Sequence, residues 1–411
     1  MLAQTLRGMG HEVSGVFGLD VGRDPAAREA QFYDRLVRTP PPRRRRRIGR
    51  LIDDLGMMFG STALEVPAGQ AITTAFEDRL PKFDRLVSSA RLFDRAHAYF
   101  RLTGRVATLR MKDPPAIMHW TYPVPVRLAG ARNIYTIHDV VPLRLPFTTL
   151  DDKQGYRRLI EACAREAQHI CTVSDASRRD IISCFSVAPD KVSNTYQVSP
   201  MDEAVLAEDP AEAARAIEGI FGLRHREYFL FFGAIEPKKN LGRLIEAYLS
   251  LQTPTPLVIV AGRSWQSEGE LRLLPGQEEA SDPQYAHLTD RILRIDYLPR
   301  RLLMRLARGA RAVTFPSLYE GFGLPVHEAM LLGAPVLSST EGSIPEIAGD
   351  AALLIDPYDV SAIADALRRL DTDVLLRDEL SRRGPFQARL FSSDRYQERL
   401  LKMYGLAMGA A

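Results

Sequence analysis

The sequence predicts an α/β protein with a parallel, doubly wound sheet in its C-terminal half. The chain has 411 residues, which is long enough for two domains with separate cores. Short apolar runs alternate there with helical patterns, as in such sheets. Hydrophobic residues make up 45% of the chain and charged residues 26%, which is typical of a globular protein and excludes a disordered one.

The C-terminal half shows this alternation most clearly. Strands are expected at 228–232, 257–261, 291–297, 312–315 and 334–338, and helices at 241–250, 302–307 and 324–332. We expect residues 210–222 and 262–285 to form connections. Residues 375–408 are expected to form two helices.

The N-terminal half is less regular. Strands are expected at 12–17, 116–120, 133–137 and 169–173, and helices at 151–167 and 177–184. Residues 1–13 predict a helix that ends at Gly8 or Gly10 and leads into the second strand of a doubly wound domain. The first strand and its glycine-rich turn are then missing, which would expose a central sheet edge. We therefore expect the natural start to lie upstream; loss of part of the cleft is the alternative.

Positive charge is concentrated in the N-terminal half. Residues 1–200 hold 30 Lys and Arg against 21 Asp and Glu, whereas the rest holds 24 against 30. The extreme is a run of five arginines, Arg43, Arg44, Arg45, Arg46 and Arg47. A solvated loop is the ordinary explanation, and contact with anionic lipid headgroups or a pyrophosphate-linked acceptor is the functional one. Nucleic acid is not expected, because no aromatic residues are interleaved with the arginines.

Cysteine usage and hydropathy indicate a cytoplasmic protein. Cys163, Cys171 and Cys184 lack metal-ligand spacing and are expected to be free thiols. No apolar run approaches the length of a membrane span, and no signal peptide is recognisable. Peripheral contact with the inner membrane through the arginine run is the alternative to a wholly cytoplasmic location.

A glycine-bracketed turn between two glutamates is the most informative motif. The apolar run 312–315 predicts a buried strand, and Pro325 fits the first turn of the next helix. Glu320 is then expected to follow the strand, and Glu328 to lie in the first turn of the helix. Glycine lets a ligand approach the backbone, and a helix N-terminus attracts phosphate. The motif suits a nucleotide diphosphate joined to a sugar; two solvated glutamates are the ordinary alternative.

A second motif follows the strand at 228–232. Gly233 leads into a turn with Lys238 and Lys239, and a lysine there can meet a diphosphate that lies across the strand ends. Solvent exposure is the alternative for Lys238. Arg263, after the next strand, is expected to add positive charge.

The main N-terminal motif is a histidine and an aspartate at a strand end. His138 lies where ligands bind in such sheets, although a structural role is the more common one for a lone histidine. Asp139 is expected to orient His138 or cap the loop. His119 and Trp120 end the preceding strand, where an acceptor-side role and core packing are equally expected. Ser174 is expected to be a helix N-cap in the first place and a ligand-binding residue only in the second.

The turn between the glutamates resembles the signature of retaining glycosyltransferase family 4. The residues that carry this resemblance are Glu320, Gly321, Phe322, Gly323, Leu324 and Glu328. It implies the GT-B architecture, in which two Rossmann-like domains face a central cleft. We expect these domains at 1–200 and 201–385, with 386–411 crossing back to the N-terminal domain.

The resemblance also implies roles for individual residues. Glu320 should bind the hydroxyls of the transferred sugar, and Glu328 the ribose. Lys239 falls at the family's phosphate-binding lysine, where it stabilises the leaving diphosphate together with Arg263 and the amides of 321–324. His138 falls at a histidine that faces the transferred sugar. The segment at 341–347 should border the nucleotide, although helix capping explains its polar residues equally well.

Residues 233–240 resemble the bacterial mannosyltransferases that build O-antigen and exopolysaccharide, a branch that commonly uses GDP-mannose. The chain departs from many family members at Ala234, where they carry an arginine. The expected reaction transfers a hexose, mannose from GDP-mannose, to a saccharide or lipid-linked saccharide. The family's mechanism implies retention by front-side attack. The site motifs contain no Asp-x-Asp sequence, and the one at Asp371–Asp373 lies outside them, so metal independence is expected.

Three alternatives stay open. One is the same reaction with a UDP-sugar donor. Another is a different GT-B activity, such as a phosphorylase or a sugar-nucleotide epimerase, which the paired glutamates disfavour. The third is an inactive scaffold in a polysaccharide-assembly complex.

Overall fold

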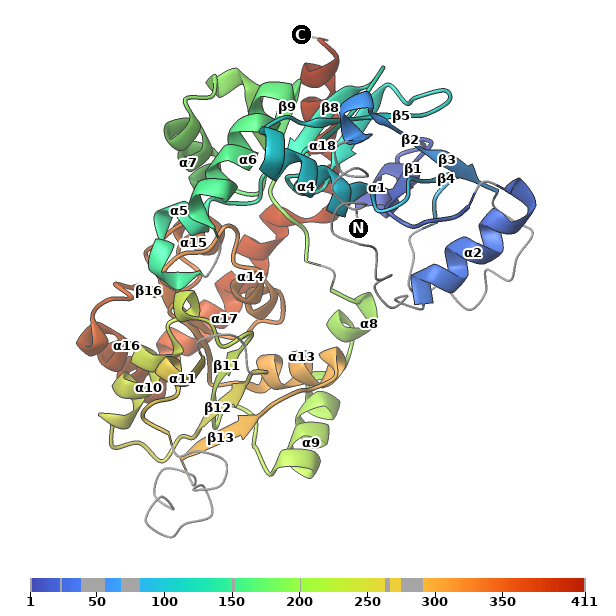
Figure 1. Ribbon diagram of the computed structural model, residues 1–411. Coiled ribbons are helices and arrows are strands. Elements are labelled where there is room, and N and C mark those ends of the chain that lie inside the picture. Colours follow the sequence, from blue (N-terminus) through green and yellow to red (C-terminus); the bar gives the residue numbers. More distant parts are fainter. Residues whose placement is uncertain are drawn as a thin grey trace.

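The structure is a computed structural model in which two α/β halves lie against one another (Figure 1). It describes residues 2–22, 24–37, 56–67, 82–149, 152–199, 201–262, 267–274 and 291–409. The arginine run at 43–47 and Arg263 lie outside these residues. The prediction of an α/β fold with a doubly wound sheet is confirmed.

The C-terminal half is built on a six-stranded parallel sheet of order β13-β12-β11-β14-β15-β16. Its strands are β11 (Phe229–Phe232), β12 (Leu257–Val260), β13 (Ile292–Ile295), β14 (Ala312–Phe315), β15 (Val336–Ser339) and β16 (Leu353–Ile355). The four central strands are buried throughout, which explains why they are almost continuously apolar. The strand order reverses between β11 and β14. In such sheets the crevice outside that switch point binds ligands.

Helices cover both faces of this sheet (Figure 1). They are α8 (Glu203–Leu206), α9 (Pro210–Phe221), α10 (Leu241–Leu249), α11 (Ser267–Glu270), α13 (Arg300–Gly309), α14 (Leu324–Leu331), α15 (Ile344–Ala348), α16 (Val360–Thr372) and α17 (Val374–Ala388). The expectation of a connection at 210–222 is wrong, because α9 fills it. Asp209 accepts a hydrogen bond from Ala211 N at 3.0 Å, and Pro210 occupies the first turn.

The N-terminal half divides its strands among three sheets, of orders β1-β4-β3, β10-β9-β8-β6 and β2-β5-β7. The strands are β1 (Ser14–Phe17), β2 (Ser61–Thr62), β3 (Leu64–Val66), β4 (Arg85–Ser88), β5 (Ala107–Arg110), β6 (Ile117–Trp120), β7 (Val126–Leu128), β8 (Arg132–Thr136), β9 (His169–Thr172) and β10 (Val192–Asn194). The four predicted strands are present as β1, β6, β8 and β9. Both β1 and β6 end a sheet, so the expected single sheet is interrupted between them.

The helices of this half are α1 (Leu2–Gly8), α2 (Pro25–Val37), α4 (Leu92–Thr103), α5 (Val141–Arg144), α6 (Lys153–Glu166) and α7 (Asp175–Phe185). The predicted helices at 151–167 and 177–184 are confirmed as α6 and α7. The first helix ends at Gly8, as expected. Ser174 caps α7 by accepting a hydrogen bond from Ser177 N at 3.0 Å.

The terminal helix α18 (Ser393–Met408) lies against the N-terminal half (Figure 1, red). Its buried face, made of Tyr396, Leu400, Met403 and Ala407, packs on Ile134 of β8 and Cys171 of β9. The chain therefore crosses back between the halves. The domain boundaries themselves stay predictions. Across the described part of the chain, no helix is both long and apolar enough to cross a bilayer.

Candidate active site

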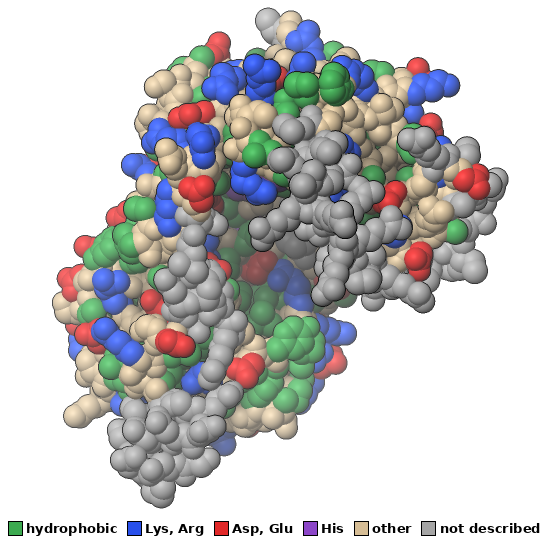
Figure 2. Space-filling view, in the orientation of Figure 1, with side chains coloured by type: hydrophobic (Ala, Val, Ile, Leu, Met, Phe, Trp, Pro, Cys, Tyr) green, Lys and Arg blue, Asp and Glu red, His purple; other side chains and the backbone are tan. Residues whose placement is uncertain are grey.

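Figure 2 shows a hollow between the two halves, with acidic and basic side chains on its floor. The carboxyl ends of β11 and β14 open toward this region, and each is followed by a loop with a charged residue. After β11, Gly233 adopts a φ of 139°, which only glycine adopts readily. The 3₁₀ turn Pro237–Lys239 then positions two lysines.

Lys239 and Glu320 form the centre of the candidate site. Lys239 Nζ lies 2.7 Å from Glu320 Oε1 and 4.9 Å from the centroid of the Phe315 ring. Both side chains are largely buried, with exposed fractions of 14% and 9%. An ammonium has three N–H donors, so one bond to Glu320 leaves two for a phosphate. The structure therefore brings together Lys239, which is expected to bind the donor phosphate, and Glu320, which is expected to bind the sugar hydroxyls.

A tight turn fixes the backbone of Glu320. Ser343 donates hydrogen bonds to Glu320 O from its amide at 3.1 Å and from its hydroxyl at 3.0 Å. Gly342 has a φ of 61°, and a side chain there would lie 2.7 Å from the same carbonyl oxygen. The segment expected to border the nucleotide thus holds Glu320 in place. Ser343 does so through its side chain, which does not cap its own helix.

The N-terminus of α14 points its first amides toward the same loop. Gly323 is the N-cap residue at φ 90°, and no side chain among the described residues caps the helix. Pro325 lies in the first turn, as predicted. These open amides and the helix dipole suit an anionic group. Leu324 begins the helix and can contribute only its backbone amide to an anion.

Phe322 belongs to an aromatic cluster with Tyr196, His327 and Phe391. Its side chain is 3% exposed. The ring therefore anchors the loop in the core, and any contact with a donor would come from the backbone.

Glu328 lies in the second turn of α14, so the expectation of a first-turn position is wrong by one turn. The helix starts at Leu324 as expected, so Glu328 is its fifth residue and falls just beyond the first turn. Glu328 is 4% exposed as a residue, and its carboxylate accepts hydrogen bonds from Ser199 Oγ at 2.8 Å and Arg300 at 2.6 Å. A ribose hydroxyl would share this carboxylate with Arg300.

Asp139 reaches the site from the N-terminal half. A side chain at Gly321 would lie 2.7 Å from Asp139 Oδ2, so the two loops are in close contact. Asp139 Oδ1 also accepts a hydrogen bond from Val141 N at 3.1 Å, in agreement with the expected capping role. Burial alone would lower the pKa of Lys238, but Glu320, Glu236 and Asp139 outweigh it and raise the pKa. Lys238 is therefore a charged member of this cluster rather than a solvated side chain.

His138 is exposed at the end of β8, next to Asp139. Loss of solvation by surrounding atoms lowers its pKa, while Asp139 acts to raise it. The ring is therefore mainly neutral at pH 7 and can donate or accept a hydrogen bond. Its role toward the sugar stays a prediction.

His119 and Trp120 use their ring nitrogens inside the protein. His119 bonds to Tyr404 Oη and to Thr136 Oγ1, each at 2.8 Å, and Trp120 Nε1 donates to Asn133 at 3.0 Å. Trp120 is 4% exposed and belongs to the core of the N-terminal half. Core packing therefore accounts for Trp120, and the acceptor-side role of both residues stays a prediction.

The two halves also meet beside the site. Tyr319 donates a hydrogen bond to Asp180 of α7, which Arg144 contacts at 2.5 Å. Glu346 accepts hydrogen bonds from Asp175 N at 3.0 Å and Ala176 N at 2.8 Å, so it caps α7 rather than its own helix. The Tyr319 contact holds the loop after β14 against the N-terminal half, and the Glu346 contacts hold α15 against it.

Two functional neighbours were missed from the sequence, Arg300 and Tyr319. Arg300 begins α13, where a positive charge opposes the helix dipole unless an anion compensates it. Two consecutive arginines at that position were a usable signal, and their partners are Glu328 and Glu208. Tyr319 carried no comparable signal, because its partner lies 139 positions away.

The site can bind an anion and a polyol side by side. Two lysines and the open amides of α14 face the anion, and Glu320 and Asp139 offer acceptors for hydroxyl groups. Among the described residues, no group of three or more His, Cys, Asp or Glu side chains is arranged to hold a metal ion.

Comparison with known proteins agrees with this geometry. Residues 216–385 match the family described as glycosyl transferases group 1. The O-antigen chain mannosyltransferase B of Escherichia coli is 31% identical over 280 residues, which are 67% of this chain and 70% of that protein. The O-antigen chain mannosyltransferase RfbU of Salmonella typhimurium is 25% identical over 62% of this chain and 64% of its own length. The matched part covers only 33% of a third relative, the serotype-specific mannosyltransferase WbdA of Escherichia coli, at 28% identity.

Solved structures share the fold at lower identity. The sucrose-phosphate synthase of Thermosynechococcus elongatus aligns with a TM-score of 0.60 and 16% identity, over 98% of this chain and 100% of that one. The Anabaena protein HepE, solved with UDP and glucose, aligns with a TM-score of 0.62 and 14% identity, over 96% of this chain and 100% of that one. The fold is GT-B, as expected. The chain belongs to the group 1 glycosyl transferases, and it is a glycosyltransferase.

Proposed function

We propose that this glycosyltransferase moves mannose from GDP-mannose to a saccharide or lipid-linked saccharide during surface polysaccharide synthesis. The observation that carries the proposal is the buried Lys239–Glu320 pair at the switch point of the sheet, beside the open N-terminus of α14. The choice of mannose rests on the relatives, whose names describe O-antigen mannosyltransferases. The choice of GDP rests on the resemblance of residues 233–240 to that branch.

In the proposed reaction the donor diphosphate lies between Lys239 and the amides of 321–324. As the bond from the sugar to the phosphate breaks, negative charge grows on the leaving GDP, and these groups stabilise it. Arg263 is proposed to add to this charge. Glu320 holds sugar hydroxyls, Glu328 the ribose, and His138 contacts the sugar near its phosphate. The acceptor oxygen forms the new bond on the same face, so the configuration at the anomeric carbon is retained.

We further propose that the reaction needs no metal and that the protein is cytoplasmic. The lysines and amides would carry out the charge stabilisation that a metal performs in other sites. The arginines at 43–47 are proposed to contact an anionic inner-membrane surface. Co-sedimentation with phosphatidylglycerol vesicles, compared between the natural chain and a chain with all five replaced by glutamine, tests that contact.

A transfer assay tests the proposed function. The purified protein is incubated with lipid-linked saccharides extracted from bacterial membranes and with radiolabelled GDP-mannose, UDP-glucose or UDP-N-acetylglucosamine. We expect label to pass to the acceptor only from GDP-mannose, with excess EDTA having no effect, and NMR to show the donor's α configuration in the product. Transfer from a UDP-sugar alone would support glycosyl transfer but would refute GDP-mannose as the donor. No transfer from any donor would favour the alternative that the protein is an inactive scaffold in a polysaccharide-assembly complex.

A further inference from the structure

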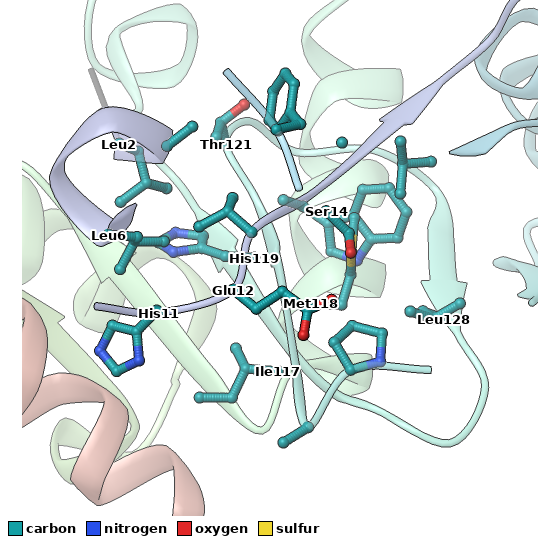
Figure 3. Close-up of a pocket in the computed structure, with 18 of the residues that line it drawn as sticks. Leu2, Leu6, His11, Glu12, Ser14, Ile117, Met118, His119, Thr121 and Leu128 are labelled. Atoms are coloured by element: carbon teal, nitrogen blue, oxygen red, sulfur yellow. The ribbon is translucent and has the colours of Figure 1, made fainter. Parts of the chain in front are cut away.

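A cavity of about 820 Å³ lies between β1 and β6 in the N-terminal half (Figure 3). Apolar side chains such as Leu2, Leu6 and Ile117 point into it, and His119 already uses both ring nitrogens in bonds within the protein. The hydroxyl groups of a ribose need hydrogen-bond acceptors, which this apolar lining supplies poorly. The carboxylate of Glu328, in the other half, is such an acceptor.

Both hydrogen bonds that the Glu328 side chain accepts within the described part of the chain end on the same oxygen. Ser199 Oγ donates to Oε1 at 2.8 Å, and Arg300 Nη2 donates to Oε1 at 2.6 Å. An ionised carboxylate has about two lone-pair sites on each oxygen, so these donors fill Oε1. No hydrogen bond from the described residues reaches Oε2. The carboxylate therefore has one oxygen held by the protein and one left for a ligand.

Ser199 belongs to the linker that joins the two halves, between β10 and α8, and is only 6% exposed. Earlier in the same linker, the Tyr196 hydroxyl donates a hydrogen bond to Glu346 at 3.1 Å. The Tyr196 ring lies edge-on to the ring of Phe391, with centroids 5.0 Å apart. The linker is thus anchored before it reaches Glu328, so its buried serine is a fixed donor rather than a mobile one.

Arg300 holds the same oxygen from a separate segment, the first turn of α13. Its bond joins two charged groups and is therefore stronger than a bond from a neutral donor. The neighbouring Arg301 pairs with Glu208 instead, at 2.8 Å, so the two consecutive arginines have different partners. With a hydroxyl and a guanidinium on one oxygen, the Glu328 side chain is ordered before a ligand arrives, and less conformational freedom is lost when one binds.

We propose that Ser199 and Arg300 are positioning residues for the nucleotide. They hold Oε1 of Glu328 so that Oε2 accepts hydrogen bonds from the ribose hydroxyls, and they act through this carboxylate rather than on the reacting atoms. The inference rests on the proposed function, in which Glu328 binds the ribose. It gives the linker and α13 a share in selecting ribose over deoxyribose, because an acceptor fixed in place rejects a ligand that lacks the hydroxyl.

Calorimetric titration with GDP and 2′,3′-dideoxy-GDP tests the proposal. The readout is the ratio of the two dissociation constants, since a purely structural defect weakens both ligands alike and leaves the ratio unchanged. We expect the natural chain to bind the dideoxy form at least about thirty-fold more weakly, and Ser199→Ala to lower this ratio at least about three-fold. Ser193→Ala, which removes a serine bond to His169 instead, is the control and should keep the natural ratio. A natural ratio near one, or an unchanged ratio in Ser199→Ala, would overturn the proposal.

The two arginines provide a second matched comparison. Arg300→Met keeps most of the side-chain length but loses the bond to Glu328, and it should lower the ratio at least about three-fold. Arg301→Met, whose partner is Glu208, should leave it unchanged. Equal ratios in these two variants would overturn the role of Arg300.

A double substitution tests whether Ser199 acts through Glu328. Glu328→Ala is expected to bring the ratio close to one, and adding Ser199→Ala should then change it no further. A further fall in the double variant would show that Ser199 affects the ribose by another route and would overturn the assignment.

Parallel titrations with UDP and its dideoxy form separate this inference from the proposed function. If UDP binds in place of GDP, GDP-mannose is refuted as the donor, and the ratio measured with UDP decides the roles of Ser199 and Arg300. Binding of GDP with unchanged ratios in the variants would overturn this inference alone. No binding of either nucleotide by the folded natural chain would overturn both.

Discussion

At the residue scale, the ammonium of Lys239 can serve two partners at once. It contacts Glu320 at 2.7 Å and keeps two donors for phosphate. We predict that Lys239→Ala lowers kcat/KM about 10²-fold, because one stabilising donor is lost as charge grows on the leaving group. Lys402→Ala, an exposed position on α18, is the control and should change kcat/KM less than about two-fold. Equal kinetics of the two variants would show that Lys239 is not a functional residue of the site.

The imidazole of His119 leads to a prediction about how the free energy of unfolding depends on pH. Burial, and to a smaller extent His138, lowers the pKa of His119 to about 4. The unfolded chain holds this proton near the ordinary value of about 6.5. The stabilisation is therefore complete above pH 6.5 and is lost as the pH falls toward 4. At pH 5 the loss is about 2 kcal/mol relative to pH 7.

Urea unfolding at pH 7 and pH 5 measures this loss. His119→Gln cannot titrate, so its free energy of unfolding should fall less than that of the natural chain over the same interval. The comparison of two proteins cancels the other histidines. An equal fall in both would show that His119 does not resist protonation in the folded state.

At the element scale, the loop from β14 to α14 is fitted tightly against the N-terminal half. A methyl group at Gly321 would lie 2.7 Å from Asp139 Oδ2 and 3.0 Å from Asp139 Cβ, so Gly321→Ala must displace the Asp139 side chain or one of the two loops. We predict a fall of ten- to a hundred-fold in kcat/KM, since small displacements in a reacting site are costly. Gly219→Ala in α9, where a methyl group meets nothing within 4 Å, is the control and should leave kcat/KM unchanged. Natural kinetics in Gly321→Ala would show that the contact has no catalytic importance.

Helix α18 should stabilise the N-terminal half. Leu400 is fully buried between this helix and the strands β8 and β9. We predict that Leu400→Ala lowers the free energy of unfolding by about 3 kcal/mol, because it leaves a cavity. Leu406→Ala on the same helix is 46% exposed and should cost less than about 1 kcal/mol. Similar losses in thermal or urea unfolding would contradict the packing of α18.

Elements were predictable where one local pattern was strong. The strands β11, β12 and β14 are apolar and buried on both faces. Their short apolar runs predict buried strands of a parallel sheet. The helix at 210–221 was mistaken for a connection, although Asp209 and Pro210 gave a readable start signal. The break between β1 and β6 is a tertiary feature. It depends on pairing between segments about 100 residues apart, which no local pattern records.

At the scale of the whole molecule, the candidate site depends on both halves. The loop that carries Glu320 belongs to the C-terminal half, whereas Asp139 and Asp180 reach it from the other. The motif residues were predictable because they follow strand ends in one sheet. Tyr319 could not be assigned a role, because its partner Asp180 lies 139 positions away, whereas Arg300 carried a usable signal that was missed. Domain closure on the donor would tighten these same contacts.

Calorimetric titration of the natural full-length protein tests the central claim most directly. The ligands are GDP-mannose, GDP and UDP-glucose, without added metal, and Lys239→Ala is titrated in parallel. We predict that GDP-mannose and GDP bind at one site per chain, that UDP-glucose does not, and that Lys239→Ala binds at least about ten-fold more weakly. Binding of UDP-glucose alone would refute GDP-mannose as the donor. No binding by a folded protein, or equal binding by Lys239→Ala, would contradict the site itself.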